Sequence, residues 1–304
     1  MMKNWEAEKM TKYLSVIGLL FVTIIWGGGF VASDIALDSL KPFQIMAIRF
    51  FLAFVLIGLI ARRDLKKMKK KEIQAGLFMG IALFAGFAFQ TVGLQYTTPS
   101  KNAFLTALNV VIVPFITFLF LKKKINKKGI LGAVMAVVGV DILSLNQDFS
   151  LSLGDFLTLL CAVGFAFQIF LTSIYVKECR TMVINFIQMG TATVLSLVFM
   201  GIMREGTIKA TTNGWLSVLY LGIVSTTLCF LLQTICQKYV EETKTAIILS
   251  MESVFGTIFS IWILKEQMTI RMMIGCAIIL IAVIISNLDE GEEEKISDVS
   301  WERA

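Results

Sequence analysis

The sequence contains no histidine, which excludes catalysis by an imidazole base, a haem or zinc site with histidine ligands, and an imidazole proton relay. Charge is also scarce, because only 16% of the 304 residues are charged while 57% are hydrophobic. The mean hydropathy is +0.79. A chain this apolar does not suit a soluble globular fold, so we expect its solvent to be a lipid bilayer.

Several motifs are missing as well. There is no nucleotide-binding loop of the G-x-x-x-x-G-K-[ST] type, so ATP is not expected to drive the protein directly. The lysines accompany no nucleic-acid motif, and the five cysteines have neither metal-ligand nor disulfide spacing. We therefore expect no cofactor, no metal and no nucleic-acid partner. Clustered nucleophiles or acid–base pairs are also absent outside the C-terminal tail, so an enzyme is not expected.

Apolar segments of about twenty residues fill the chain, and each is long enough to cross a bilayer core of roughly 30 Å as a helix. Their ranges are 13–33, 43–61, 73–93, 100–121, 128–145, 153–175, 182–203, 214–236, 244–264 and 270–287. The first segment has no clear cleavage site and is interpreted as a retained span. The sequence thus predicts an all-α integral membrane protein with ten transmembrane helices.

The charges of the connections predict the orientation, because short loops rich in Lys and Arg stay in the cytoplasm. The second connection, "RRDLKKMKKKE", carries seven such residues and the fourth, "KKKINKK", carries five. We expect both the N-terminal tail (1–12) and the acidic C-terminal tail (289–304) to be cytoplasmic, in the cytoplasmic membrane. The lysine-rich loops are expected to bind anionic lipid headgroups. Whether the chain forms a homodimer stays open.

The chain also repeats itself at an offset of 143 residues. "FAFQTVGLQYTTPSKNAFL" (87–105) then lies over "FLLQTICQKYVEETKTAII" (230–248), which aligns Gln-Thr, Tyr and Lys at once. Each half, 13–145 and 153–288, holds five spans, and an odd number places the halves in opposite orientations. This predicts a 5+5 inverted repeat, the plan of many secondary transporters, with a site near the bilayer midplane.

Four stretches carry a resemblance to a known family: "IIWGGGFVAS", "PFQIMAIRF", "GLQYTTPSKNAFLTALNVVIVPFI" and "SMESVFGTIFSIWILKEQMT". In this order they resemble the EamA family of the drug/metabolite transporter superfamily, over residues 13 to 288. The resemblance implies an exporter or exchanger of small metabolites, in which the first four helices of each repeat surround a cavity. The fifth and tenth helices would stand aside as supports. Ser253 occupies the position of the family's usual proline.

Charged residues inside the predicted spans are costly and need a partner, water or a task. Asp141 and Asp155 lie near the outer ends of their spans, where we expect them to reach headgroups or water. Arg49 lies six residues into the second span and Glu252 lies near the midplane. Two interpretations stay open for this pair: a structural ion pair, or a carboxylate lining a wet cavity with Arg49 as its charge partner. Glu266 is interpreted as a helix-end residue.

Polar residues of the two repeats predict the walls of one cavity. Glu252 overlies Asn109 at the 143-residue offset, and both lie on polar helix faces. The expected substrate-binding residues are Glu252, Asn109, Gln90, Gln233, Trp26, Thr106 and Gln168, of which Trp26 is favoured by the resemblance. Interhelical hydrogen bonding is the alternative for the amides. Gly27, Gly28 and Gly29 either soften the first helix for a gate or allow close packing.

The favoured function is a secondary transporter that moves a small metabolite, such as an amino acid or a drug-like compound, by alternating access. Export or proton-coupled exchange is the expected mode, with Glu252 as the candidate proton carrier. One alternative is a sensor or structural protein on the same scaffold that does not transport, for which the acidic tail would be the contact. The least favoured alternative is a membrane-embedded enzyme.

Overall fold

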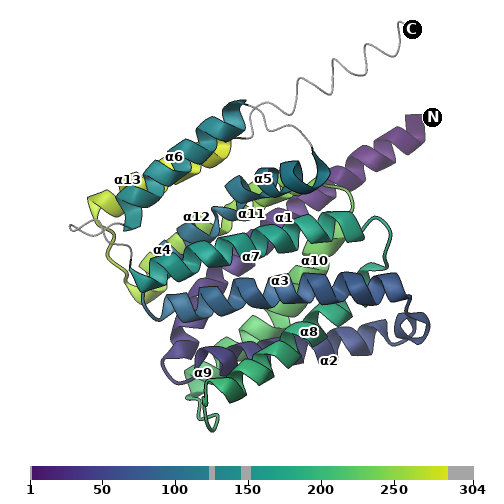
Figure 1. Cartoon of the computed structure of the whole chain (residues 1–304), viewed down its shortest axis with the longest axis horizontal. Helices are drawn as coiled ribbons and strands as arrows, with labels where there is room; N and C mark the ends of the chain where they lie inside the picture. Colours follow the sequence, from purple (N-terminus) through teal and green to yellow (C-terminus); the bar gives the residue numbers. More distant parts are fainter. Residues whose placement is uncertain (1, 123–126, 145–151, 287–304) are drawn as a thin grey trace, which may run out of the picture.

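The computed structural model describes residues 2–122, 127–144 and 152–286, and every regular element in these ranges is helical (Figure 1). The first half holds α1 (Met2–Leu37), α2 (Pro42–Ala61), η1 (Asp64–Lys67), α3 (Lys70–Leu94), α4 (Pro99–Thr106), α5 (Asn109–Leu121) and α6 (Lys127–Ser144). The second holds α7 (Leu153–Tyr175), α8 (Thr181–Ile202), α9 (Thr212–Leu219), η2 (Tyr220–Leu228), α10 (Cys229–Cys236), α11 (Glu242–Ser250), α12 (Glu252–Phe259), η3 (Ser260–Leu264) and α13 (Ile270–Ser286). The predicted acidic tail (289–304) lies outside the described residues.

Eight helical segments of the described chain are long and apolar enough to cross a membrane. They are Met10–Leu37, Pro42–Ala61, Lys70–Leu94, Pro99–Leu121, Leu153–Tyr175, Thr181–Ile202, Thr212–Cys236 and Glu242–Leu264. α6 is not among them, and the apolar part of α13, Ile270–Ala282, is shorter. The protein is thus a multi-pass membrane protein, while the full count of ten spans is not confirmed. α1 also begins at Met2, well before the expected residue 13.

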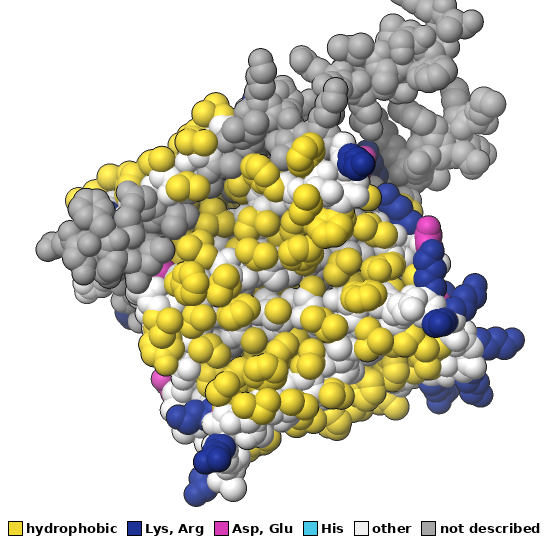
Figure 2. All heavy atoms as spheres, viewed as in Figure 1, with side chains coloured by type: hydrophobic (Ala, Val, Ile, Leu, Met, Phe, Trp, Pro, Cys, Tyr) yellow, Lys and Arg dark blue, Asp and Glu magenta, His cyan; other side chains and the backbone are white. Residues whose placement is uncertain are grey.

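The surface suits a bilayer. Figure 2 shows a broad apolar face, with Lys and Arg gathered at the edge of the molecule where the α2–α3 connection lies. This connection and the first turn of α3 expose Arg62, Arg63 and five lysines up to Lys71. We call this edge of the bundle the lysine end. The connections α1–α2, α3–α4, α8–α9 and η3–α13 lie at the opposite end, because successive spans alternate in direction.

The helices pack in a pattern that relates the two halves. α3 packs against α7 and α8, while in the other half α10 packs against α1 and η2 packs against α2. α4 and α5 contact α7, just as α11 and α12 contact α1. α6 and α13 pack along each other at one side of the bundle (Figure 1), where Arg271 Nε donates a hydrogen bond of 2.7 Å to the Ile142 carbonyl. This pair thus stands aside from the other helices, as the resemblance implies.

Two of the long apolar segments are interrupted at equivalent positions. α4 ends at Thr106 and α5 begins at Asn109, whereas α11 ends at Ser250 and α12 begins at Glu252. Tighter i→i+3 hydrogen bonds bridge both breaks, from Val110 N to Ala107 O (3.2 Å) and from Val254 N to Met251 O (3.1 Å). Asn109 and Glu252 therefore both begin the second part of an interrupted helix.

The two interrupted segments also end alike. Lys122 after α5 and Lys265 after η3 both have a φ of 56°, in the left-handed region that commonly ends helices. Non-glycine residues adopt this conformation seldom. Its occurrence at two positions 143 residues apart supports the sequence repeat with backbone geometry.

Candidate functional site

A cavity of about 630 Å³, its mouth included, lies between the helices that the two halves contribute. Its lining residues are Trp26, Gly29, Phe30, Ser33, Arg49, Phe87, Gln90, Thr91, Leu94, Asn102, Asn109, Phe165, Gln168, Ile169, Ser225, Phe230, Gln233, Leu249 and Glu252. The structure thus brings together most of the residues that the sequence predicts for the site. Thr106 is the exception among the expected ligands: it is fully buried behind Gln90, whose Nε2 donates to its Oγ1 at 3.2 Å.

Glu252 is the acidic residue of this wall. It is 6% exposed and forms no hydrogen bond or ion pair with a described residue. Its repeat counterpart Asn109 also lines the cavity, and the Oδ1 atom of Asn109 is buried without a hydrogen-bond partner among the described residues. Both side chains therefore offer oxygen atoms that the protein itself leaves unused.

Arg49 does not form the ion pair with Glu252 that we expected from the sequence. Its Nε donates instead to Thr226 Oγ1 in η2, at 3.0 Å. Its guanidinium carbon lies 4.1 Å from the centre of the Phe87 ring and 5.7 Å from that of Phe50. A cation over a ring face is stabilised by the ring quadrupole, which explains why the side chain turns toward α3. The expected contact is therefore replaced by an aromatic and a hydroxyl contact.

Aromatic rings form one wall of the cavity. The centroids of Trp26 and Phe230 are 5.0 Å apart, those of Phe87 and Phe230 are 6.0 Å apart, and those of Phe87 and Phe165 are 4.9 Å apart. Trp26 Nε1 donates to the carbonyl of Ser225 at 2.8 Å, inside the π-helical segment η2. These contacts fix the rings, so the wall is an apolar surface of set shape. We call these four residues the ring wall.

Amide side chains close the cavity toward the lysine end. Gln233 Nε2 donates to Gln168 Oε1 (3.2 Å) and to Gln237 Oε1 (3.0 Å), and Gln168 Nε2 lies 3.5 Å from Gln188 Oε1. All four are at most 2% exposed. Gln188 Nε2 and Gln233 Oε1 have no partner among the described residues. Gln188 and Gln237 were missed at the sequence level, although an amide within the apolar span 182–203 is a usable signal.

The glycines of α1 act mainly as contact points. A Cβ on Gly27 would lie 2.6 Å from Phe255 Cβ and 2.8 Å from the backbone nitrogen of Gly256. A Cβ on Gly28 would lie 2.9 Å from the Tyr220 hydroxyl, and Gly29 lines the cavity beside Ser225. α1 is continuous through all three. The structure therefore favours close packing over a bend at this place.

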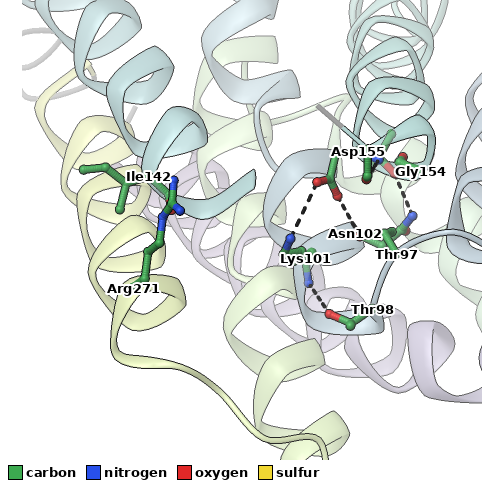
Figure 3. Close-up of polar contacts among 10 residues, drawn as sticks. Thr97, Thr98, Lys101, Asn102, Ile142, Gly154, Asp155 and Arg271 are labelled. Carbon is green, nitrogen blue, oxygen red and sulfur yellow. Dashed lines mark hydrogen bonds and ion pairs between the residues drawn. The ribbon is translucent and has the colours of Figure 1, made fainter. Parts of the chain in front are cut away.

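Asp155 does not reach headgroups or water, contrary to our expectation. It is fully buried and accepts a hydrogen bond from Thr97 Oγ1 at 2.6 Å, and its Oδ2 lies 3.6 Å from Lys101 Nζ (Figure 3). The neighbouring Asn102 donates to Thr158 Oγ1 at 2.9 Å. Asp155 thus joins the start of α7 to the α3–α4 connection. The side chain of Asp141 lies outside the described part.

Further carboxylates join helix ends. Glu72 holds Arg180 through two hydrogen bonds of 2.7 and 2.8 Å at the lysine end, which raises the pKa of Arg180. At the opposite end Glu205 accepts from the backbone N–H groups of Phe43 and Gln44, and burial raises its pKa while these two bonds oppose the shift. Glu266 accepts from Ser100 N and Oγ, which agrees with its interpretation as a helix-end residue.

The comparisons with known proteins agree with this architecture. A model described as the EamA-like transporter family matches residues 13–145 and again residues 152–288. The chain belongs to this family. A protein of Archaeoglobus fulgidus named "Uncharacterized transporter" is 34% identical over 282 residues, which cover 93% of this chain and 88% of the relative.

More distant relatives of this EamA-family chain cover it as fully. "Uncharacterized transporter YoaV" of Bacillus subtilis is 24% identical over 89% of this chain and 96% of its own length. One solved crystal structure matches with a TM-score of 0.68 at 17% identity, over 90% of this chain and 97% of its own. At that identity the match shows the fold alone. The family and its relatives make the protein a membrane transporter.

Proposed function

We propose that the protein is a secondary transporter that moves a small metabolite through the central cavity by alternating access. The observation that carries the proposal is the cavity itself, whose wall holds the unpartnered carboxylate of Glu252 close to the helix break. A volume of several hundred Å³ with apolar walls and a few polar groups is typical of small-molecule sites. The substrate would be an amino acid or another small metabolite or drug-like compound.

The lining supports a site between two inverted halves of five spans each. Four pairs of lining residues are related by the 143-residue offset: Gln90 with Gln233, Asn109 with Glu252, Phe87 with Phe230 and Trp26 with Ile169. Residues that both repeats contribute lie where the halves meet, as expected of an inverted repeat. In this proposal α6 and α13 are the fifth and tenth spans.

The remaining lining residues support one of the two access states. Ser33, Thr91 and Leu94 line the cavity toward the opposite end, whereas their repeat counterparts Val176, Thr234 and Gln237 are buried and do not line it. We infer a cavity that opens to the opposite end and is closed by amides at the lysine end. If the lysine end is cytoplasmic, as the positive charges favour, this is the outward-facing state, with both termini inside.

Glu252 is the proposed proton carrier, because it is the acidic residue among the described lining residues and nothing in the protein neutralises it. A carboxylate without a partner inside a membrane is a functional-site hypothesis by default. Exchange of substrate for protons would make the protein an exporter when the proton gradient points inward. The direction of flux follows from the gradients rather than from the cavity.

The test is counterflow in proteoliposomes that contain the purified full chain. Amino acids, nucleosides and quaternary amines are loaded inside, and entry of the labelled compound is measured between pH 5.5 and 8. We expect at least one compound to exchange, and Glu252→Gln to slow exchange about tenfold or more and to remove its pH dependence. Glu241→Gln, an exposed carboxylate near the lysine end, is the control and should behave as wild type.

Two outcomes would contradict the proposal. Normal exchange by Glu252→Gln with an unchanged pH profile would exclude the proton role. No exchange of any compound, together with a cellular phenotype that depends on the acidic tail alone, would favour the sensor alternative.

A further inference from the structure

Arg49 has hydrogen-bonding capacity that the protein does not use. The residue lines the cavity and is 2% exposed, and its Nε is held by Thr226 Oγ1. Its two Nη groups form no hydrogen bond with any described residue. A guanidinium presents its donors as a rigid planar fork, which matches the two oxygens of a carboxylate. The cavity wall thus carries one half of a bidentate contact.

The charge of Arg49 is also uncompensated within the described structure. A neutral hydroxyl and the face of Phe87 contact the guanidinium, but no carboxylate does. Burying a charge without a counter-charge is costly, and a ring face offsets only part of that cost. Glu252, the acidic lining residue, remains apart from Arg49 although both face the same space. An anion brought by a bound molecule would supply what is missing.

The surroundings of Arg49 indicate what kind of anion fits. Arg49 is the one cation among the described lining residues, so a monoanion is balanced and a dianion is not. Phe87 lies under the guanidinium and belongs to the ring wall, so an apolar body attached to the anion would lie against Phe165, Phe230 and Trp26. This combination describes an organic monocarboxylate with an aromatic or aliphatic body.

The contact is present in one half only. The residue of α8 at the 143-residue offset from Arg49 is Ala192, which is fully buried and does not line the cavity. We propose that Arg49 is a specificity-determining residue that binds the carboxylate of an organic monocarboxylate, and that it does so from the side of the opposite end alone. The inference rests on the proposed transport function for its setting, but its binding step can be measured separately.

The test uses the full chain in lipid nanodiscs at constant ionic strength, with the thermal unfolding midpoint as the readout. The probes are sodium benzoate, the neutral analogue benzamide and inorganic phosphate. We expect benzoate to raise the midpoint saturably, while benzamide and phosphate leave it unchanged. Arg49→Gln should weaken the apparent benzoate affinity at least tenfold. Arg204→Gln, which removes an exposed arginine of the α8–α9 connection, is the matched control and should bind as wild type.

Two further variants keep the test decisive if Arg49→Gln does not fold. Arg49→Lys keeps the charge but loses the fork, so it should bind benzoate more weakly than wild type and more tightly than Arg49→Gln. Thr226→Val keeps the shape but releases Nε, and as a positioning change it should weaken benzoate binding a few-fold. Equal benzoate affinity in wild type, Arg49→Lys and Thr226→Val would overturn the proposal. So would the lack of a saturable benzoate effect on wild type, or an equal effect of benzamide.

Counterflow in the same preparation separates this inference from the proposed function. If wild type exchanges neutral or cationic compounds but benzoate does not bind, the inference on Arg49 is wrong and transport stands. If benzoate binds through Arg49 and no compound exchanges, the transport proposal is the one that fails.

Discussion

The buried carboxylate of Asp155 allows a quantitative prediction, because its two partners are defined and differ in kind. Lys101 contributes a charge whose Nζ lies 3.6 Å from Oδ2, and Thr97 contributes a hydroxyl that donates to Oδ1 at 2.6 Å. The side chain of Asp155 is fully buried, whereas that of Lys101 is 22% exposed. Replacing Asp155 therefore leaves a lysine that can still reach water. The loss should be smaller than for a pair buried on both sides.

The magnitude follows from the two contacts. At an effective dielectric constant near 20, charges 3.6 Å apart attract by about 4–5 kcal/mol before the cost of desolvation, and a hydrogen bond to a charged group contributes about 1.5–3 kcal/mol net. Asp155→Asn keeps an acceptor for Thr97 and should cost about 2 kcal/mol. Asp155→Ala loses both contacts and should cost about 3–4 kcal/mol.

The assay is unfolding of the purified chain in mixed micelles, with Asp38→Asn, an exposed carboxylate at the end of α1, as the control. A double-mutant cycle with Lys101→Met isolates the ion pair and should give a coupling of about 1–2 kcal/mol. A coupling near zero, or an Asp155→Asn variant within about 0.5 kcal/mol of wild type, would refute the reasoning. The carboxylate would then be held by Thr97 alone.

Two other predictions concern packing and closure. Gly27→Ala should destabilise the protein by about 1–3 kcal/mol in the same assay, because its Cβ would meet Phe255 and the backbone of α12, whereas Gly201→Ala, with nothing within 4 Å, should be neutral or stabilising. Equal effects of the two would contradict the close contact. Arg180→Gln should open the lysine end by removing its bonds to Glu72, so hydrogen exchange at the start of α8 should rise at least tenfold; unchanged exchange there would show that Glu72 does not hold this end.

The arrangement of the spans was largely predictable from the sequence because the bilayer imposes it. Apolar length and loop charge locate the helices, and the offset of 143 residues relates Asn109 to Glu252 before any coordinates are known. The helix breaks were not predicted. Nothing in "SMESVFG" marks Met251 as a break, since the family's proline is absent and the local i→i+3 bonding depends on neighbouring helices.

The membership of the cavity was predictable, but the contacts of its charged residues were not. Depth along a span placed Arg49 and Glu252 in the same region, and both do line the cavity. Pairing opposite charges by depth alone ignores the direction of the side chain, which Phe87 and Thr226 decide for Arg49. Asp155 shows the converse, since a position near a span end suggested water while Thr97 and Lys101 bury it.

The repeat also distinguishes two kinds of polar residue. Gln90 and Gln233 occupy equivalent positions, so an exchange of access between the two ends would leave an amide in place on either side. Arg49 has Ala192 as its counterpart, and Asp155 has Lys12. A charge that one half lacks cannot be reproduced when the halves exchange roles, so in the proposed cycle it acts in one state only. The single charges are therefore where the two access states should differ in affinity, while the paired amides should set what both states share.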